Sequence, residues 1–157
     1  LTAFLGAWVI GRFEDTIQQL VALAILMPVV AGMGGIAGSQ TLTIAIRGIA
    51  LGHIAKTNIK PLLIKELSIG ILNGIFWSSV VAIIVIVWFG QFSLGIIIGA
   101  SMMINLIIAA LAGATIPIIL KHYGIDPAIA GGVILTTVTD VVGFITFLGL
   151  ATIFLIG

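Results

Sequence analysis

The run FSLGIIIGASMMINLIIAALAGATIPIIL, residues 92–120, contains no charged residue and decides the fold class. A helix needs about 20 apolar residues to cross the hydrocarbon core of a bilayer. The strands of a membrane β-barrel are short and alternate apolar with polar positions, whereas this run does not alternate. The stretch therefore predicts a transmembrane α-helix.

The composition of the whole chain agrees with a membrane protein. Of its 157 residues, 61% are hydrophobic and 7% are charged, whereas about a quarter of a soluble domain is charged. The net charge of +1 gives no indication of a nucleic-acid partner. The chain has no cysteine, so a bound metal would need oxygen or imidazole ligands. We expect the lipid bilayer of the cell (inner) membrane to be its main solvent.

Outward from the central run, further apolar stretches predict an all-α helix bundle in one domain, residues 1–157. We expect five transmembrane helices, at about residues 1–11, 20–50, 68–89, 92–120 and 128–156. The first is too short to cross a bilayer and is expected to be partial, with an N-terminal portion missing. Pro28 and the glycines after it should kink or loosen the second helix. Gly124, Asp126 and Pro127 predict a helix end followed by a capped helix start.

The basic residues predict the orientation. Five of the six fall on one side of the predicted bundle: Arg47, Lys56, Lys60, Lys65 and Lys121. By the positive-inside rule that side is cytoplasmic, which gives a cytoplasmic N-terminal side and an external C-terminus. The segment PLLIKELS, residues 61–68, should lie partly in the membrane interface before the third helix enters the bilayer.

Most of the small and amide residues are expected to serve helix packing. Residues of this kind recur every four positions in the third and fourth helices, a pattern that lets membrane helices approach closely. These residues are Gly70, Gly74, Ser78, Gly95 and Gly99. Asn73 and Asn105 are expected to form hydrogen bonds between helices.

Asp140 requires a different explanation, because it lies in the middle of the apolar run ILTTVTDVVGFITF, residues 134–147. An aspartate at the centre of a membrane helix costs about 2.5 to 3.5 kcal/mol on insertion scales, and such residues are usually functional. Helical spacing places Gly132, Thr136 and Gly143 on its face, with Thr137 close by. The face predicts the wall of a wet pore or cavity. The alternative is that Asp140 joins two helices as a protonated or hydrogen-bonded residue, with Arg47 or Asn105 as its partner.

The other polar residues give weaker signals. His53 and His122 fall in predicted loops and lack a second ligand one helical turn away, so they are expected to be solvated rather than metal-bound. Glu14 and Asp15 are expected in a solvated external loop, where they could concentrate cations.

Charge matching favours a divalent cation in a dimer. One carboxylate per chain is a poor divalent site, but two copies of Asp140 near a symmetry axis match a charge of +2. Magnesium keeps several waters and is often bound by one or two carboxylates. Backbone carbonyls freed in the glycine-rich second helix could line the rest of the path.

Two stretches also resemble a known family. PVVAGMGGIAGSQTLTIAIRGIALG, residues 28–52, is similar to the second transmembrane helix of the MgtE family of magnesium channels, and DPAIAGGVILTTVTDVVGF, residues 126–144, is similar to its fifth. The resemblance implies a homodimer whose central pore is lined by these two helices, with the magnesium-binding aspartate at Asp140. It also implies a cytoplasmic Mg²⁺-sensing N-terminal region, which this chain does not contain.

The resemblance further assigns a pore-helix motif to the glycine-rich stretch. The motif residues are Gly32, Gly34, Gly35, Gly38, Ser39 and Gln40. The family pattern commonly reads GGNAGNQ, whereas this chain has Ile36 and Ser39 in place of the asparagines. The departures leave other divalent cations such as Mn²⁺ as alternatives to Mg²⁺.

Two further interpretations of the sequence stay open. In a proton- or sodium-coupled secondary transporter, Asp140 would be a relay and the broken second helix would bind an organic substrate, although a matching second break is not seen. In a membrane anchor or assembly subunit, the small-residue faces would only bind partners. An enzyme is not expected, because no nucleophile and base share a face.

Overall fold

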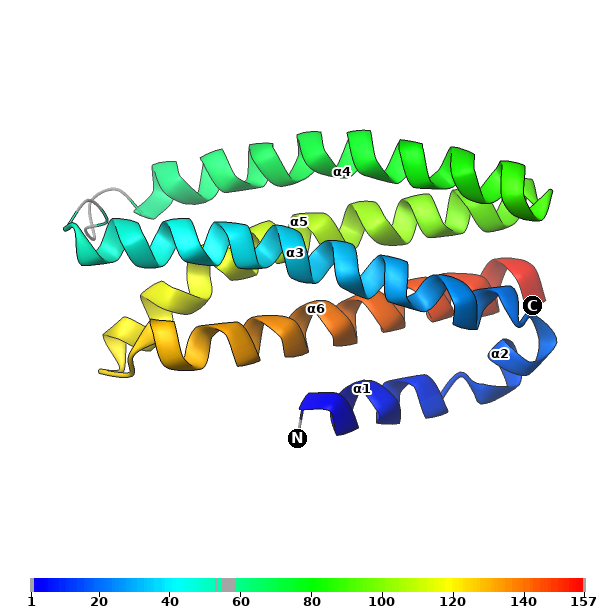
Figure 1. Ribbon diagram of the computed structural model, residues 1–157, viewed down its shortest axis with the longest axis horizontal. Coiled ribbons are helices and arrows are strands. Elements are labelled where there is room, and N and C mark those ends of the chain that lie inside the picture. The colour runs from blue at the N-terminus through cyan, green and yellow to red at the C-terminus, as the bar shows by residue number, and fades with distance from the viewer. Residues whose placement is uncertain (1, 53, 55–58, 157) are drawn as a thin grey trace.

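The computed structural model describes residues 2–52, 54 and 59–156, and all regular elements in this part of the chain are helices (Figure 1). The predictions for His53 and Lys56 lie outside the described residues. Four helices are long and apolar enough to cross a membrane: α3 (Ala22–Ala50), α4 (Ile59–Phe89), α5 (Phe92–His122) and α6 (Pro127–Ala151). Helix α6 continues into a π-helical turn, η1 (Thr152–Ile156). The all-helical membrane class is thereby confirmed.

Two short helices precede the long ones. Helix α1 (Thr2–Gly11) has 10 residues and is apolar, as predicted, but it is too short to cross a bilayer alone. Helix α2 (Glu14–Gln19) was not predicted, because its six residues are polar and give no apolar pattern. Helix α1 packs against α6, where the ring of Phe144 lies over Gly6.

Helix α4 begins at Ile59 rather than at residue 68. The segment PLLIKELS is thus a continuous part of the helix and is not set off from the span by a turn. At 1.5 Å per residue the 31 residues of α4 extend for about 46 Å, which exceeds a hydrocarbon core of about 30 Å. The first turns of α4, with Lys60 and Lys65, therefore have the length to lie at the interface.

The glycine-rich stretch does not interrupt its helix, and the expected kink or loosening stays a prediction. Helix α3 is continuous from Ala22 to Ala50 and includes Pro28 and all the motif glycines. Proline and glycine are tolerated in membrane helices because no water competes for the backbone and neighbouring helices support it. The glycine-rich stretch therefore keeps its carbonyls in helical geometry.

The turn between α5 and α6 has the structure that the sequence predicts. Gly124 has a φ of 72°, which favours glycine, and the N–H of Ile125 donates to the carbonyl of Leu120 at 2.9 Å. The carboxylate of Asp126 accepts from the N–H of Ala128 at 2.8 Å, and Pro127 occupies the first turn of α6. These two features end one span and start the next.

Helix α5 is the central element of the bundle and contacts α3, α4 and α6 (Figure 1). The predicted small-residue packing between α4 and α5 is confirmed. Gly70 lies against Ala110, Gly74 against Met103, and Gly95 and Gly99 lie against Ala82. Ser78 is buried on the same face of α4.

The packed interior consists of two apolar clusters. The larger surrounds Leu23, Leu94 and Phe147 near the end of the bundle where α5 begins. The smaller contains Leu42, Ile116, Leu120 and Leu135 near the other end. Between them along α5 lies the buried polar side chain of Asn105. The bundle thus has a polar layer at mid-height.

Candidate ion site on the open face of helix α6

Asp140 lies near the middle of α6 and is half-buried. Its height in the bundle follows from contacts between α3 and α6. Three pairs fix an antiparallel register: Val30 with Gly143, Gly38 with Leu135, and Leu42 with Gly131. In this register Asp140 is level with Met33, inside the glycine-rich stretch of α3.

The register argues against the two partners considered for Asp140. Arg47 lies about four turns further along α3, or about 20 Å at 1.5 Å per residue, and its side chain is exposed. The amide of Asn105 donates instead to the carbonyl of Val30, at 2.9 Å. Within residues 2–52, 54 and 59–156, no hydrogen bond or ion pair engages the carboxylate of Asp140.

The predicted polar face of α6 is open over part of its length. Gly132 and Thr136 are exposed, and Thr137 is half-buried like Asp140. Gly143 differs, because it is buried against Asn105 and Val30 on the packed side of the helix. The open face therefore runs from Gly132 to Asp140.

The hydroxyl groups on this face are oriented as acceptors. Thr136 donates its hydroxyl proton to the carbonyl of Gly132 at 2.9 Å, and Thr137 donates to Val133 at 2.8 Å. Each hydroxyl oxygen keeps lone pairs, and an ionised Asp140 only accepts. The waters around a cation point their hydrogens outward, so a wall of acceptors suits a hydrated cation.

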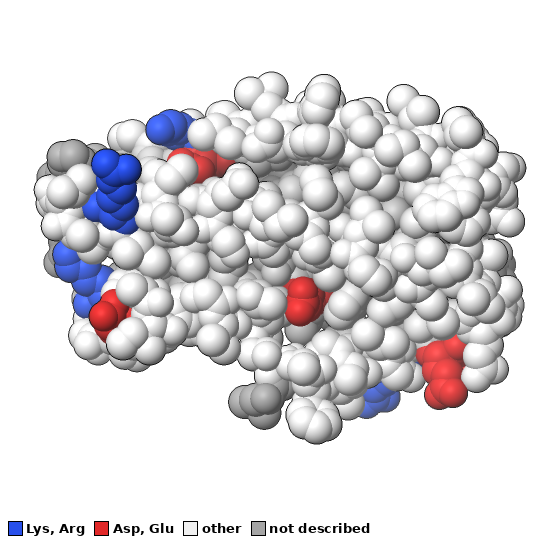
Figure 2. Space-filling model, in the orientation of Figure 1, with Lys and Arg blue, Asp and Glu red and all other residues white. Residues whose placement is uncertain are grey.

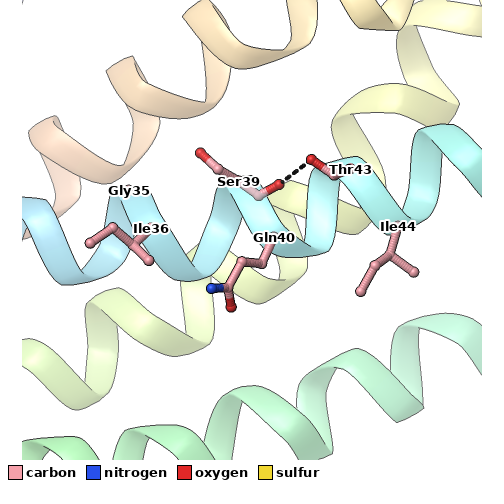
Figure 3. A pocket seen from close by; sticks show the side chains of 6 residues that line it. All are labelled: Gly35, Ile36, Ser39, Gln40, Thr43 and Ile44. Carbon is pink, nitrogen blue, oxygen red and sulfur yellow. Dashed lines mark hydrogen bonds between the residues drawn. The ribbon is translucent and has the colours of Figure 1, made fainter.

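The pore-helix motif of α3 divides between two faces. Gly34 and Gly38 are buried and lie against Asn105 and Leu135. Ser39 and Gln40 are exposed and border an open hollow of about 680 Å³ on α3 (Figure 3). Added side-chain carbons at Gly32 and Gly35 would meet open space.

The exposed part of the motif offers its own polar groups. Figure 3 shows Ser39 and Gln40 projecting from opposite sides of α3. The backbone carbonyl of Ser39 accepts the hydroxyl proton of Thr43 at 2.8 Å. The motif thus presents side-chain groups, rather than freed backbone carbonyls, on its open face.

The described part of the chain contains no group of three His, Cys, Asp or Glu residues that could hold a metal ion. Asp140 is the carboxylate on the open face of α6, and His122 lies at the end of α5 with its ring against Tyr123. A cation on this face would therefore meet a single carboxylate of this chain, that of Asp140.

Sequence reasoning missed one buried acidic residue, Glu66. Its side chain is 4% exposed, and its carboxylate accepts the hydroxyl proton of Thr41 at 3.4 Å between α4 and α3. Glu66 precedes Gly70 by one helical repeat of four and shares its buried face. Extending the small-residue stripe by one step toward the N-terminus of α4 would have predicted this burial.

Basic residues are concentrated at one end of the bundle. On the face shown in Figure 2, most Lys and Arg side chains gather at that end, and the surface between the two ends is uncharged apart from one acidic side chain near its middle. Lys60, Lys65 and Lys121 belong to the end where α4 begins and α5 finishes. The uncharged surface is suited to lipid.

Long apolar helices with a half-exposed carboxylate at mid-height define a polytopic membrane protein with a candidate functional site inside the membrane. The MgtE family model, described as a divalent cation transporter, matches residues 27–150. The chain belongs to this family, as the resemblance of α3 and α6 predicted.

Three curated relatives, each named magnesium transporter MgtE, cover nearly the whole chain. The protein of Bacillus subtilis is 40% identical over 147 residues, which are 94% of this chain and 33% of that protein. The Enterococcus faecalis protein is 31% identical over 97% of this chain and 34% of its own length. The Thermus thermophilus protein is 30% identical over 99% of this chain and 34% of its own length. The chain thus spans about a third of these relatives.

Proposed function

We propose that this chain is the ion-conducting transmembrane domain of a divalent cation transporter, with Mg²⁺ as the main cargo and Mn²⁺ as the alternative one. The observation that carries the proposal is Asp140, a carboxylate at mid-span on an open face of acceptor groups. The names of the curated relatives support magnesium as the cargo.

The proposed transporter is a homodimer with its pore between the open faces of α3 and α6. Two copies of Asp140 would face each other across the axis and match the charge of a hydrated divalent ion. Each buried carboxylate costs about 2.5 to 3.5 kcal/mol in a single chain, and a cation between the pair offsets this cost. Ser39 and Gln40 of α3 would line the path next to the α6 faces.

The proposed orientation in the membrane follows from the basic residues, and the proposed remainder of the protein follows from the length of the relatives. The end with Lys60, Lys65 and Lys121 would face the cytoplasm, which places the N-terminal side there and the C-terminus outside. Helix α1 would be the second part of a fifth spanning helix. Since the chain spans about a third of its relatives, a cytoplasmic Mg²⁺-sensing region in the full-length protein fits the remaining length.

The proposal is tested by Mg²⁺ uptake into vesicles that contain the full-length protein with Asp140→Asn. The change keeps the side-chain shape and removes the charge. Hydrogen bonds to charged groups contribute about 1.5 to 3 kcal/mol each, so two lost carboxylates should reduce uptake at least tenfold. Asp126→Asn is the matched control, because it removes an exposed carboxylate at the start of α6 while asparagine can still cap the helix. Normal selective uptake by Asp140→Asn would refute the site.

The same measurement separates the transporter from the coupled alternative. A proton- or sodium-driven carrier was expected to use a broken second helix, whereas α3 is continuous. If Mg²⁺ uptake follows the Mg²⁺ gradient without an imposed proton or sodium gradient, the relay role of Asp140 is excluded.

A further inference from the structure

Asn105 occupies an unusual position at the centre of the bundle. Its side chain is fully buried in α5, and its amide nitrogen donates to the carbonyl of Val30 in α3 at 2.9 Å. Its side-chain oxygen is buried and has no hydrogen-bond partner in the described part of the chain. One polar side chain thus joins two helices through a single hydrogen bond, while its oxygen stays unpaired.

Two glycines create the space for this amide. A side-chain carbon at Gly34 of α3 would overlap the amide nitrogen and lie 2.8 Å from the amide carbon of Asn105. A side-chain carbon at Gly143 of α6 would lie 2.9 Å from the same nitrogen. The amide is therefore held between α3 and α6, and both glycines are required by its size.

The contacts of Asn105 lie at the height of the ion site. In the antiparallel register, Val30 is level with Gly143, and Asp140 is level with Met33. The amide of Asn105 therefore lies within one helical turn of the height of Asp140. It is on the packed side of α3 and α6, and the proposed pore is on the open faces of the same two helices. Asn105 bonds α5 to α3 and packs against Gly143 of α6 at that height.

Stability does not explain an asparagine here. A buried acceptor without a partner costs about 1 to 3 kcal/mol, and an apolar side chain of similar size would avoid this cost. Buried polar groups can instead select one register among several that apolar packing would permit. Packed leucine and glycine surfaces would permit one helix to slide along another. The hydrogen bond from Asn105 to the carbonyl of Val30 does not, because it can form in only one register.

We infer that Asn105 is a positioning residue for Asp140: it sets the height of α6 relative to α3 and thereby the geometry of the cation site. This inference rests on the proposed function of Asp140. It also assigns Gly34 a role in receiving the amide, rather than in lining the pore.

The test uses full-length protein in vesicles and measures the half-saturating Mg²⁺ concentration, the maximal uptake rate and the midpoint of thermal unfolding. Asn105→Leu keeps the volume and removes the hydrogen bond. We expect its unfolding midpoint to be unchanged or raised, and its half-saturating Mg²⁺ concentration to rise at least tenfold. A shift of about 1 Å in a binding group is enough for such an effect.

A second pair of variants keeps the test decisive if Asn105→Leu folds poorly. Gly34→Ala should lower the unfolding midpoint, because its methyl group overlaps the amide. Gly34→Ala combined with Asn105→Ala removes the overlap, so the midpoint should recover while the half-saturating concentration stays high. A double variant with recovered stability and near-normal Mg²⁺ dependence would overturn the inference.

Asp140→Asn measured in parallel separates the two claims. If Asp140→Asn loses uptake while Asn105→Leu keeps its half-saturating concentration within twofold, the positioning role is wrong and the proposed function stands. If Asp140→Asn takes up Mg²⁺ normally, the proposed function fails and the positioning role fails with it. A fall in maximal rate alone in Asn105→Leu also contradicts positioning.

Discussion

Thr136 shows how a single hydroxyl group can serve a hydrated ion. Its proton is used within α6, in the bond to Gly132, so its oxygen faces the open surface as an acceptor. A cation that keeps its water shell presents donors, and no exchange of inner ligands is needed at such a wall.

Thr136→Val should therefore weaken Mg²⁺ uptake without unfolding the protein. Valine keeps the shape and removes the acceptor. A hydrogen bond contributes about 1 kcal/mol, so the loss of two across the proposed dimer should raise the half-saturating Mg²⁺ concentration about thirtyfold. Thr115→Val on α5 is the matched control, because Thr115 makes the same bond to its own helix, at 2.8 Å to Leu111. Equal uptake by both variants would contradict the acceptor role of Thr136.

Sequence reasoning performs unevenly at the residue scale. Asp140 is found because a charge in an apolar run is costly and therefore conspicuous. The interhelical role predicted for Asn105 is confirmed, whereas Asn73 is exposed and makes no side-chain hydrogen bond within the described residues. Glu66 was missed because it lies among lysines near a predicted helix start, where a charge is expected to be solvated. Its burial depends on α3 and α5, which are distant in sequence.

At the scale of the helices, apolar run length predicts the spans well. The C-terminal end of α5 and the N-terminal cap of α6 are determined by residues next to them in the sequence, Gly124, Asp126 and Pro127. The start of α4 is not, because its first turns mix lysines with apolar residues and become helical as a continuation of the span. The glycine-rich stretch of α3 stays helical although glycine weakens helices in water, and side chains of α5 and α6 occupy the space that Gly34 and Gly38 leave.

The α4 and α5 pair provides a prediction at this scale. Gly70 is in a close part of the contact, where an added side-chain carbon would lie 2.9 Å from the side-chain carbon of Ala110 and 3.4 Å from the backbone of α5. Gly70→Val should separate the helices and lower the free energy of unfolding by about 1 to 3 kcal/mol, the usual cost of overpacking. Unfolding in detergent by denaturant measures the change.

Gly149→Ala is the control for this substitution, because nothing lies within 4 Å of a side-chain carbon at Gly149. It should leave the free energy of unfolding unchanged or slightly raised, since alanine is the better helix former. If Gly70→Val is as stable as Gly149→Ala, close approach of α4 and α5 is not required for the fold.

At the scale of the whole molecule, the exposed surfaces of α3, α4 and α6 are chemically different. Helix α4 exposes large apolar side chains such as Leu72, Phe76 and Val87, which suit lipid. The open faces of α3 and α6 instead carry Ser39 and Thr136 among their exposed residues. A polar face on a membrane-spanning helix is stable only against protein or water. The second copy in the proposed dimer would supply both.

Because the sequence contains no cysteine, single cysteine substitutions can test the proposed dimer arrangement. Thr136→Cys should react with a water-soluble maleimide, because the reactive thiolate needs a wet surface. Ile83→Cys is the control, because Ile83 is 61% exposed on α4 and should face lipid, where the thiol stays protonated and unreactive. In the dimer, a short bifunctional maleimide should join two Thr136→Cys chains, and Mg²⁺ should slow the reaction by occupying the path. The proposed arrangement is wrong if Thr136→Cys chains are labelled but not joined. It is also wrong if Ile83→Cys chains are joined, because either result means that the α6 faces do not oppose each other across the axis.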